Sequence, residues 1–254
     1  MKGRNVGSAI RAAEEIISSG SKYAISLDLK AFFDNVPHDR LFAKLDKHII
    51  DKRVSKLVKK FTTCVKVSGN ERVINRKGCP QGSPLSSYLA SVLYLDELDQ
   101  ELTRRGHRFV RYADDVTVFC KSRKAARRIK KRICQFLEDE MGCPINYEKT
   151  TISEAEEVEM FHLVRRHGSW HIPQEKISEV LSTCRYQLQK TEETQDVELL
   201  EHSISETRGH LAYWKSIPGM NRRQLKNLTG MLEKQLACAG RLRNVLCRSI
   251  GATR

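Results

Sequence analysis

The spacing of apolar side chains near the start of the chain predicts a strand between helices. Residues 7–19 repeat apolar side chains at the period of an α-helix. Residues 23–29 instead alternate, with apolar side chains on one side and Asp28 on the other, as in a half-buried strand. Helical spacing returns over residues 39–50 and 53–61. This part of the chain therefore predicts one strand, packed among helices, that carries a single acid.

Two later stretches have the pattern of a β-hairpin, in which two apolar runs flank a short turn. Residues 64–67 and 72–74 flank the turn sequence Ser68-Gly69-Asn70. Farther on, Tyr112-Ala113-Asp114-Asp115 lies between two apolar runs. The second pattern predicts a tight hairpin with a pair of acids at its tip.

Capping residues mark two helices in the middle of the chain. Ser83-Pro84 is expected to begin a helix, with the serine as N-cap and the proline at the first helical position. Ser122 is expected to cap a long helix that Gly142 ends. In chain order, one of these helices precedes the acidic hairpin and the other follows it.

The last part of the chain is predicted to be almost entirely helical. Residues 158–172 indicate a short hairpin around Gly168. From Pro173 onward the pattern is helical, with breaks expected near Ser203 and at Pro218-Gly219. We therefore place a domain boundary near Pro173.

The charge of the chain points to a nucleic-acid partner. Its 254 residues include 45 Lys and Arg against 31 Asp and Glu, which gives a formal net charge of +14. Such an excess is typical of a nucleic-acid-binding protein, although a ribosomal-type or simply soluble basic protein shares it. The 8 cysteines contain no C-x-x-C pair, which argues against a zinc or dithiol site and fits a reducing cytoplasm. Because no 18-residue apolar run and no signal-peptide core occur, we expect a cytoplasmic protein with no membrane partner.

Asp28, Asp114 and Asp115 are the residues with the clearest chemistry. Taken singly, each is also compatible with a helix cap or an ion pair at the end of a strand. Together they suit the joining of nucleotides, which uses two divalent ions about 3.5–4 Å apart to activate the attacking hydroxyl and hold the leaving phosphate. Mg²⁺ takes carboxylate oxygens together with phosphates and water. Two neighbouring strands would bring Asp28 and Asp114 to the same pair of ions.

A tight loop precedes the helix that is predicted to begin at Ser83-Pro84. Its sequence is Gly78-Cys79-Pro80-Gln81-Gly82-Ser83-Pro84-Leu85. The backbone amides of such a loop and the positive end of the helix suit a phosphate or a template backbone. An ordinary connector between two elements has the same composition, so the loop alone leaves both interpretations open.

Three motifs in this order resemble those of reverse transcriptases, and most closely those of the group II intron-encoded branch. They are Asp28-Leu29-Lys30-Ala31-Phe32-Phe33-Asp34, Pro80-Gln81-Gly82-Ser83-Pro84-Leu85-Ser86 and Tyr112-Ala113-Asp114-Asp115. Asn146-Tyr147-Glu148-Lys149-Thr150 is similar to the next motif of that branch, and Gly209-His210-Leu211-Ala212-Tyr213-Trp214 to a motif of its thumb. The resemblance covers about residues 5–220.

The resemblance implies an α+β fold with the right-hand architecture of a polymerase. The palm would be an antiparallel sheet with packed helices, and together with partial fingers it would occupy residues 1–172. A helical thumb would occupy residues 173–254.

The resemblance also implies a role for individual residues. Asp28, Asp114 and Asp115 would be catalytic and would bind two Mg²⁺ ions, with Mn²⁺ as an alternative. Lys149 would act as general acid toward the pyrophosphate leaving group, unless it is a solvated surface lysine. The ring of Phe33 would leave no room for a ribose 2′-hydroxyl. The residues expected to bind substrate are Leu29, Lys30, Ala31, Phe32, Phe33, Gln81 and Gly82.

The expected partners are an RNA template, a primer strand, deoxynucleotides and host intron RNA. Residues 121–132 hold eight basic residues and no acid, and Arg123, Arg127, Lys130 and Lys131 share a helix face there. The stretch from residue 222 to the end is also basic and includes Arg222 and Arg223. Both surfaces suit a phosphate backbone, although a charge run is often only a solvated face. His162, His167 and His171 lack a matching acid or cysteine and are interpreted as surface or packing residues.

Some departures from the family pattern keep rival functions open. The upstream fingers segment of the family has no counterpart beyond Met1–Asn5, and no DNA-binding or endonuclease segment follows the thumb, so we expect an N-terminally truncated member. Phe161-His162-Leu163 stands where the primer-grip hairpin usually reads Phe-Leu-Gly. A non-catalytic RNA-binding splicing cofactor (maturase) or an inactive remnant remains possible on this basis. An RNA-dependent RNA polymerase is a further alternative, against which Phe33 argues.

Overall fold

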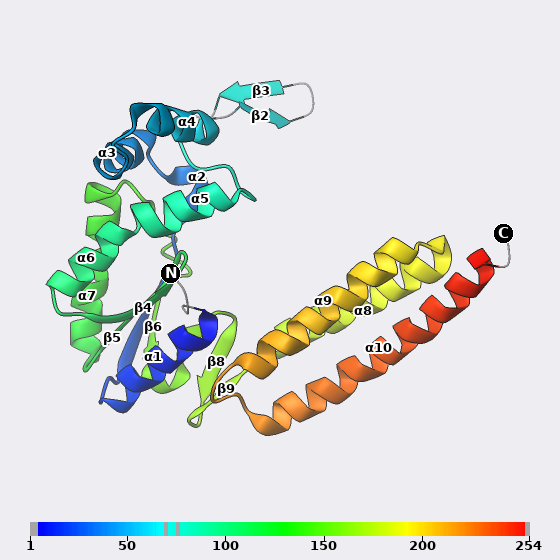
Figure 1. Cartoon of the computed structure of the whole chain (residues 1–254). Helices are drawn as coiled ribbons and strands as arrows, with labels where there is room; N and C mark the ends of the chain where they lie inside the picture. Colours follow the sequence, from blue (N-terminus) through cyan, green and yellow to red (C-terminus); the bar gives the residue numbers. More distant parts are fainter. Residues whose placement is uncertain (1–4, 64, 69–70, 75–76, 252–254) are drawn as a thin grey trace. The chain divides into compact units, whose positions relative to one another are not determined.

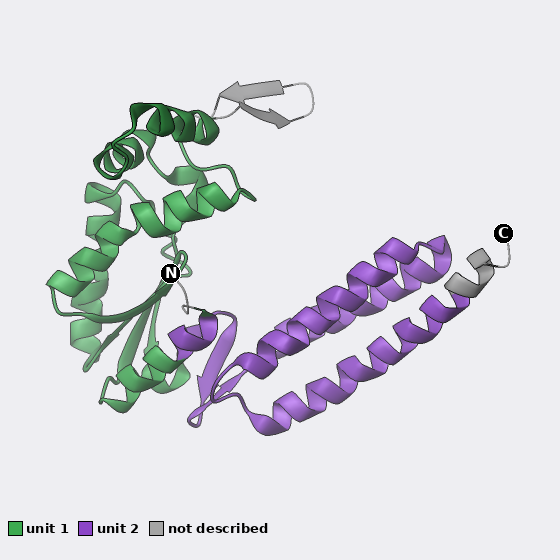
Figure 2. Cartoon of the chain, in the orientation of Figure 1, with its two compact units in different colours: residues 1–5, 11–158 green, residues 6–10, 159–254 purple. Residues whose placement is uncertain are grey.

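The computed structural model describes residues 5–63, 65–68, 71–74 and 77–251 (Figure 1). The chain divides into two compact units (Figure 2). Unit 1 holds residues 1–5 and 11–158, and unit 2 holds residues 6–10 and 159–254. The first helix, α1 (Val6–Ser18), therefore has residues in both units.

The centre of unit 1 is an antiparallel sheet of four strands in the order β4-β5-β1-β6. The strands are β1 (Tyr23–Leu27), β4 (Arg108–Tyr112), β5 (Asp115–Cys120) and β6 (Thr151–Glu154). β1 pairs with β5 on one side and with β6 on the other, so the predicted strand lies inside the sheet rather than at its edge. The predicted acidic hairpin is confirmed as β4–β5.

Helices of unit 1 surround this sheet, and several of them bury apolar side chains in one cluster with it. They are α2 (Phe32–Asn35), α3 (His38–His48), α4 (Lys52–Thr62), α5 (Pro84–Ser87), the π-helix η1 (Tyr88–Tyr94), α6 (Asp96–Arg104), α7 (Arg123–Gln135), the π-helix η2 (Phe136–Glu140) and the 3₁₀ helix η3 (Ala155–Glu157). Leu98, Ile133 and Leu137 pack into the same buried cluster as Ile25 and Val118 of the sheet. Each such side chain contributes about 1.5–3 kcal/mol by leaving water. A short hairpin, β2 (Val65–Ser68) and β3 (Glu71–Ile74), completes the unit, and Cys64, Gly69 and Asn70 of that prediction lie outside the described residues.

Unit 2 joins a small sheet to three long helices. The sheet consists of β7 (Glu159–Met160), β8 (Leu163–Arg166) and β9 (Ser169–His171), and the helices are α8 (Gln174–Thr194), α9 (Val197–Ser216) and α10 (Arg222–Gly251). The sheet is tied to the segment between α9 and α10 at Trp170. The backbone amide of Trp170 donates to the Gly219 carbonyl, and its side chain is fully buried. The main segment of unit 2 therefore begins at Glu159 and includes β7–β9, which lie before the boundary near Pro173 that the sequence indicated.

Local signals predicted most helix ends correctly. The Ser122 hydroxyl accepts a hydrogen bond from the Ala125 amide, as expected of an N-cap. Pro84 is the first residue of α5, although the Ser83 side chain makes no capping hydrogen bond.

One predicted helix break is wrong. The chain does not break near Ser203, which is buried inside the continuous helix α9. The break is instead at Gln195, which has a left-handed φ of 54°, and at Asp196, whose carboxylate caps α9. None of the helices in the described part of the chain is long and apolar enough to cross a membrane.

Candidate active site

The register of the sheet brings the predicted acids of different motifs to the same edge. The β1–β5 ladder ends with Leu27 opposite Val116. The next residue on each strand is an acid, Asp28 after Leu27 and Asp115 before Val116, so these two acids are neighbours at the end of the ladder. Asp114 follows Ala113 in the two-residue turn between β4 and β5.

Two of the three predicted acids, Asp28 and Asp114, have no partner among the described residues that would neutralise them. Asp28 and Asp114 are half-buried, and neither carboxylate makes a hydrogen bond or ion pair within the described part of the chain. No three acid, histidine or cysteine side chains among the described residues are gathered closely enough to hold a metal ion. The donor set nevertheless fits Mg²⁺, which binds oxygen ligands and usually completes its shell with water and substrate phosphates.

Backbone contacts tie the segment around Lys149 directly to Asp28. The Asp28 carbonyl accepts from the Asn146 amide at 2.9 Å, and the Asp28 amide donates to the Thr150 hydroxyl at 3.1 Å. Thr150 is buried, whereas Lys149 is exposed between these two anchor points. The loop is therefore held to Asp28 on both sides of Lys149, whose role as general acid stays a prediction.

The glycine-rich loop docks onto the segment that contains Phe33. The Cys79 amide donates to the Phe33 carbonyl at 2.6 Å, and the Gly78 amide donates to the Val36 carbonyl at 2.7 Å. A Cβ on Gly78 would lie 2.6 Å from the Phe33 carbonyl oxygen, and its φ of +83° also favours glycine. The Gln81 side chain adds a hydrogen bond of 3.3 Å to the Asp34 carboxylate. The second motif is thus fixed to the first by close backbone contact.

The predicted substrate-binding residues differ in their exposure. Lys30, Ala31, Gln81 and Gly82 are exposed, and Phe33 is half-buried with its ring edge-on to Phe32 at 5.5 Å. Leu29 and Phe32 are buried in the core, so only backbone groups of these two could reach a nucleotide.

Burial makes one nearby thiol chemically inert. Cys79 lies between Gly78 and Pro80 of the glycine-rich loop and is buried. Burial raises the pKa of the Cys79 thiol to about 11, because a thiolate would lose its hydration. Cys79 is therefore neutral near pH 7 and is a packing residue rather than a nucleophile or a metal ligand.

The predicted phosphate-binding residues fall on two helices. Arg123, Arg127 and Lys131 are exposed on α7, and Arg222 and Arg223 are exposed in the first turn of α10. Lys130 is half-buried instead. Its ammonium group donates to the carbonyl of Thr150, next to the Asp28 contact described above.

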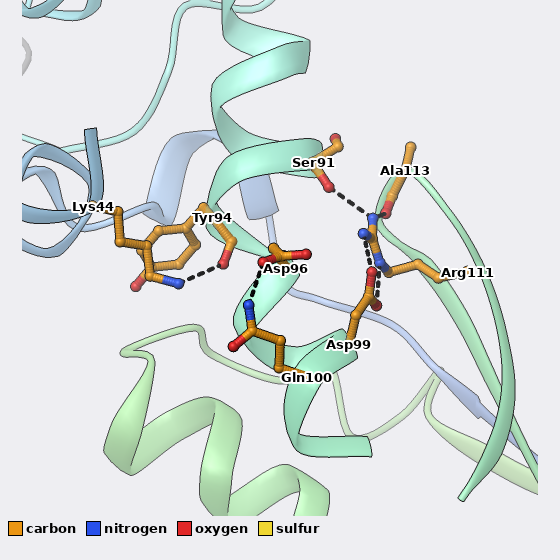
Figure 3. Close-up of polar contacts among 8 residues, drawn as sticks. All are labelled: Lys44, Ser91, Tyr94, Asp96, Asp99, Gln100, Arg111 and Ala113. Carbon is orange, nitrogen blue, oxygen red and sulfur yellow. Dashed lines mark hydrogen bonds and ion pairs between the residues drawn. The ribbon is translucent and has the colours of Figure 1, made fainter. Parts of the chain in front are cut away.

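Sequence reasoning missed the side chain that supports the acidic turn. Arg111 precedes the turn by two residues, and its guanidinium group donates to the Ala113 carbonyl and to the carboxylate of Asp99 on α6 (Figure 3). The sequence signal was a charged residue between Val110 and Tyr112 at a half-buried position of β4, where charge is unusual.

The comparison with known families agrees with this arrangement. Residues 4–191 match the family described as reverse transcriptase (RNA-dependent DNA polymerase). A 91 kDa protein in the cob intron of Schizosaccharomyces pombe is 37% identical over 98 residues, which are 39% of this chain and 12% of that protein. The group II intron-encoded protein LtrA of Lactococcus lactis subsp. cremoris is 33% identical over 81 residues, which are 32% of this chain and 13% of LtrA. The chain therefore matches only a small part of the length of these curated relatives.

Solved structures support the fold independently of sequence. Apo telomerase from Candida tropicalis superposes with a TM-score of 0.55 at 13% identity, covering 98% of this chain and 46% of that chain. At this identity the likeness is one of fold. Because the family match extends over most of the chain and its motifs meet around Asp28, the chain belongs to the reverse transcriptase family.

Proposed function

We propose that this chain extends a primer on an RNA template with deoxynucleotides, as an RNA-directed DNA polymerase of the group II intron type. The observation that carries the proposal is the convergence of four separate motifs on one edge of the sheet. Asp28 adjoins the acidic hairpin through the β1–β5 register, and its backbone holds the Lys149 loop by hydrogen bonds with the Asn146 amide and the Thr150 hydroxyl. The residues after Asp28 hold the glycine-rich loop.

Divalent ions fit the acidic edge. Reverse transcriptases use divalent metal ions. Two Mg²⁺ ions, or Mn²⁺, held by Asp28, Asp114 and Asp115 would activate the primer hydroxyl and stabilise the leaving phosphate. Unpartnered half-buried carboxylates support this assignment, since such groups are normally paired or bind a cation.

The remaining residues would bind and select the nucleotide. The Phe33 ring packs edge-on against Phe32, and its backbone carbonyl accepts from the Cys79 amide, which supports a role of this ring in excluding a 2′-hydroxyl by contact. Gln81 and Gly82 are exposed on the same loop and would line the pocket for the nucleotide and the template base. Lys149 would deliver a proton to the pyrophosphate leaving group. These roles assign residues 1–172 to the palm with partial fingers.

Nucleic acid would contact two cationic helix surfaces. The apolar side of α7 packs on the sheet, and Arg123, Arg127 and Lys131 on its exposed side make no ion pair with any described residue. Unpaired arginines and lysines on one face are suited to phosphates.

The cations at the start of α10 support the same partner. Arg222 and Arg223 occupy the first turn of the helix, which holds no acid. A helix N-terminus disfavours positive charge, so the position gives these arginines no local advantage. Contact with a phosphate backbone would account for them, and the helical thumb, residues 173–254, would then follow an RNA-containing duplex.

A primer-extension assay tests the proposal. The substrate would be poly(rA) primed with oligo(dT), with Mg²⁺ and either deoxynucleotides or ribonucleotides. We expect the protein to incorporate deoxynucleotides and Asp114→Asn to lower extension by about 100-fold or more, because it removes a metal ligand. RNA binding, measured by filter retention, should stay unchanged in the same variant.

A matched control separates the acidic edge from general charge. Glu154→Gln neutralises an exposed acid of the same sheet, opposite Tyr23 at the far end of β1 from Asp28. Extension by Glu154→Gln should equal that of the unaltered protein. Extension that survives Asp114→Asn would make the metal assignment wrong. A protein that binds RNA and extends no primer would instead favour the non-catalytic splicing cofactor.

A further inference from the structure

We propose that Arg111 and Asp99 form a positioning pair that fixes the acidic turn for catalysis. This inference rests on the proposed function, because it concerns the geometry of Asp114. It adds two residues outside the recognised motifs to the machinery of the site.

The guanidinium group of Arg111 makes four hydrogen bonds to three residues, Asp99, Ser91 and Ala113 (Figure 3). Nε and Nη2 donate to the two carboxylate oxygens of Asp99, the first at 2.7 Å. Nη1 donates to the Ser91 carbonyl at 2.7 Å and to the Ala113 carbonyl at 2.8 Å. Arginine has five N–H donors in a rigid fork, so this arrangement uses nearly all of them.

The bond to Ala113 bears directly on Asp114. The Ala113 carbonyl and the Asp114 amide belong to one planar peptide group, so a bond that fixes the carbonyl also fixes the start of Asp114. Ala113 has a φ of 54°, a left-handed conformation that is unfavourable for a residue with a side chain. A strained turn of this kind persists only where its surroundings hold it.

Asp99 in turn anchors Arg111 to the helices. Asp99 lies near the start of α6, where a negative charge is favoured by the helix dipole. The Ser91 carbonyl belongs to the π-helix η1, and both helices pack into the buried core of unit 1. The acidic turn is therefore linked through one side chain to the rigid part of the unit.

The pair is shielded enough for its contacts to be strong. The Arg111 side chain is 13% exposed and that of Asp99 is 28% exposed. A two-pronged arginine–carboxylate contact in such a place has defined geometry as well as charge. Lysine cannot reproduce it, because an ammonium group lacks the planar fork that reaches the carboxylate and the carbonyls together.

Three variants and one control test the proposal. Arg111→Lys keeps the charge but loses the fork, Arg111→Gln removes the charge, and Asp99→Asn removes the anchor. The control is Glu101→Gln on the same helix, which breaks ion pairs with Arg104 and Arg105 that do not reach the hairpin. Thermal unfolding identifies any variant that fails to fold, and Arg111→Lys is expected to keep the stability of the unaltered protein.

Two of the measurements do not depend on polymerisation. Hydrogen exchange of the peptide that spans residues 109–118, followed by mass spectrometry, should be faster in all three variants and unchanged in Glu101→Gln. Mn²⁺ binding, followed by the electron paramagnetic resonance of the free ion, should weaken in the same three variants.

Primer extension then shows whether the pair acts on catalysis. We expect kcat to fall by about 10-fold to 100-fold in Arg111→Lys and Asp99→Asn, since a small misplacement of a reacting group has effects of this size. The KM for the deoxynucleotide should change little. The proposal would be overturned if the three variants matched Glu101→Gln in hydrogen exchange, in Mn²⁺ binding and in kcat. If the unaltered protein extends no primer, the proposed function fails, while exchange and Mn²⁺ binding still decide whether Arg111 holds the turn.

Discussion

Two hairpin turns of this protein, one in each unit, both begin with a non-glycine residue of positive φ and have different supports. The turn of β4–β5 is Ala113-Asp114, and the turn of β7–β8 is Phe161-His162. Ala113, Phe161 and His162 have φ values of 54°, 54° and 60°, a conformation in which glycine or asparagine is usual. Both turns are therefore strained, and neither is relieved by its own sequence.

A side chain outside each turn donates to the carbonyl of its first residue. Arg111 contacts Ala113 at 2.8 Å with a charged donor that Asp99 anchors. Tyr213 of α9 contacts Phe161 at 3.4 Å with a neutral hydroxyl. A charged hydrogen bond contributes about twice as much as a neutral one, and a long bond contributes less still.

The second turn relies on apolar packing instead. The Phe161 side chain is only 8% exposed, whereas Ala113 is exposed and has no large side chain to bury. Backbone strain alone thus does not distinguish the turn proposed to be catalytic from the other turn. The support does, because a charged anchor fixes the direction of a peptide group and apolar burial mainly supplies stability.

The largest expected change in the free energy of unfolding follows from removing the buried Phe161 side chain. Phe161→Ala should lower the free energy of unfolding of unit 2 by about 3 kcal/mol, because it removes a buried aromatic side chain. Urea unfolding followed by tryptophan fluorescence measures this, since Trp170 and Trp214 both lie in unit 2. Phe161→Leu, which keeps most of the apolar volume, should cost about 1 kcal/mol. Equal and small losses in both variants would show that burial of this ring does not hold the turn.

A smaller effect of opposite sign is expected when the strain itself is removed. His162→Gly should raise the free energy of unfolding of unit 2 by about 1 kcal/mol, because glycine adopts a positive φ without steric cost. The same urea titration measures it. A loss of stability would contradict this prediction. It would mean that a contact of the imidazole stabilises unit 2 by more than the positive φ destabilises it.

Ala113→Gly is the matched variant in the other turn. It removes the same kind of strain but also loosens the peptide group ahead of Asp114. Primer extension should therefore fall in Ala113→Gly.

The smallest change in stability is expected from removing the Tyr213 hydroxyl. Tyr213→Phe should lower the free energy of unfolding of unit 2 by about 0.5 kcal/mol, because it removes one long hydrogen bond between neutral groups. The urea titration with tryptophan fluorescence detects this difference only against replicate curves of the unaltered protein. A loss as large as that of Phe161→Ala would remove the contrast between the two supports.

Much of the site could be predicted from short stretches of sequence. The alternation over residues 23–29 and the apolar runs around Asp114 each define a strand within a few residues, so both were predicted correctly. Helix ends with a strong local cap were also predicted, as at Ser122. The break expected near Ser203 was wrong, because this serine is buried inside a continuous helix. The real break is at Gln195, whose left-handed backbone has no clear signal in the sequence.

By itself, the sequence determined the identity and order of the acids, the cationic helices and the local pattern of strands and helices, since each follows from neighbouring residues. Only the tertiary structure decided that Asp28 adjoins Asp115, that the Asn146–Thr150 loop is held at Asp28, and that Arg111 meets Asp99. These contacts join residues far apart in the chain. They form because burying one apolar core brings several polar edges to the same place, and periodicity alone cannot specify which edges meet.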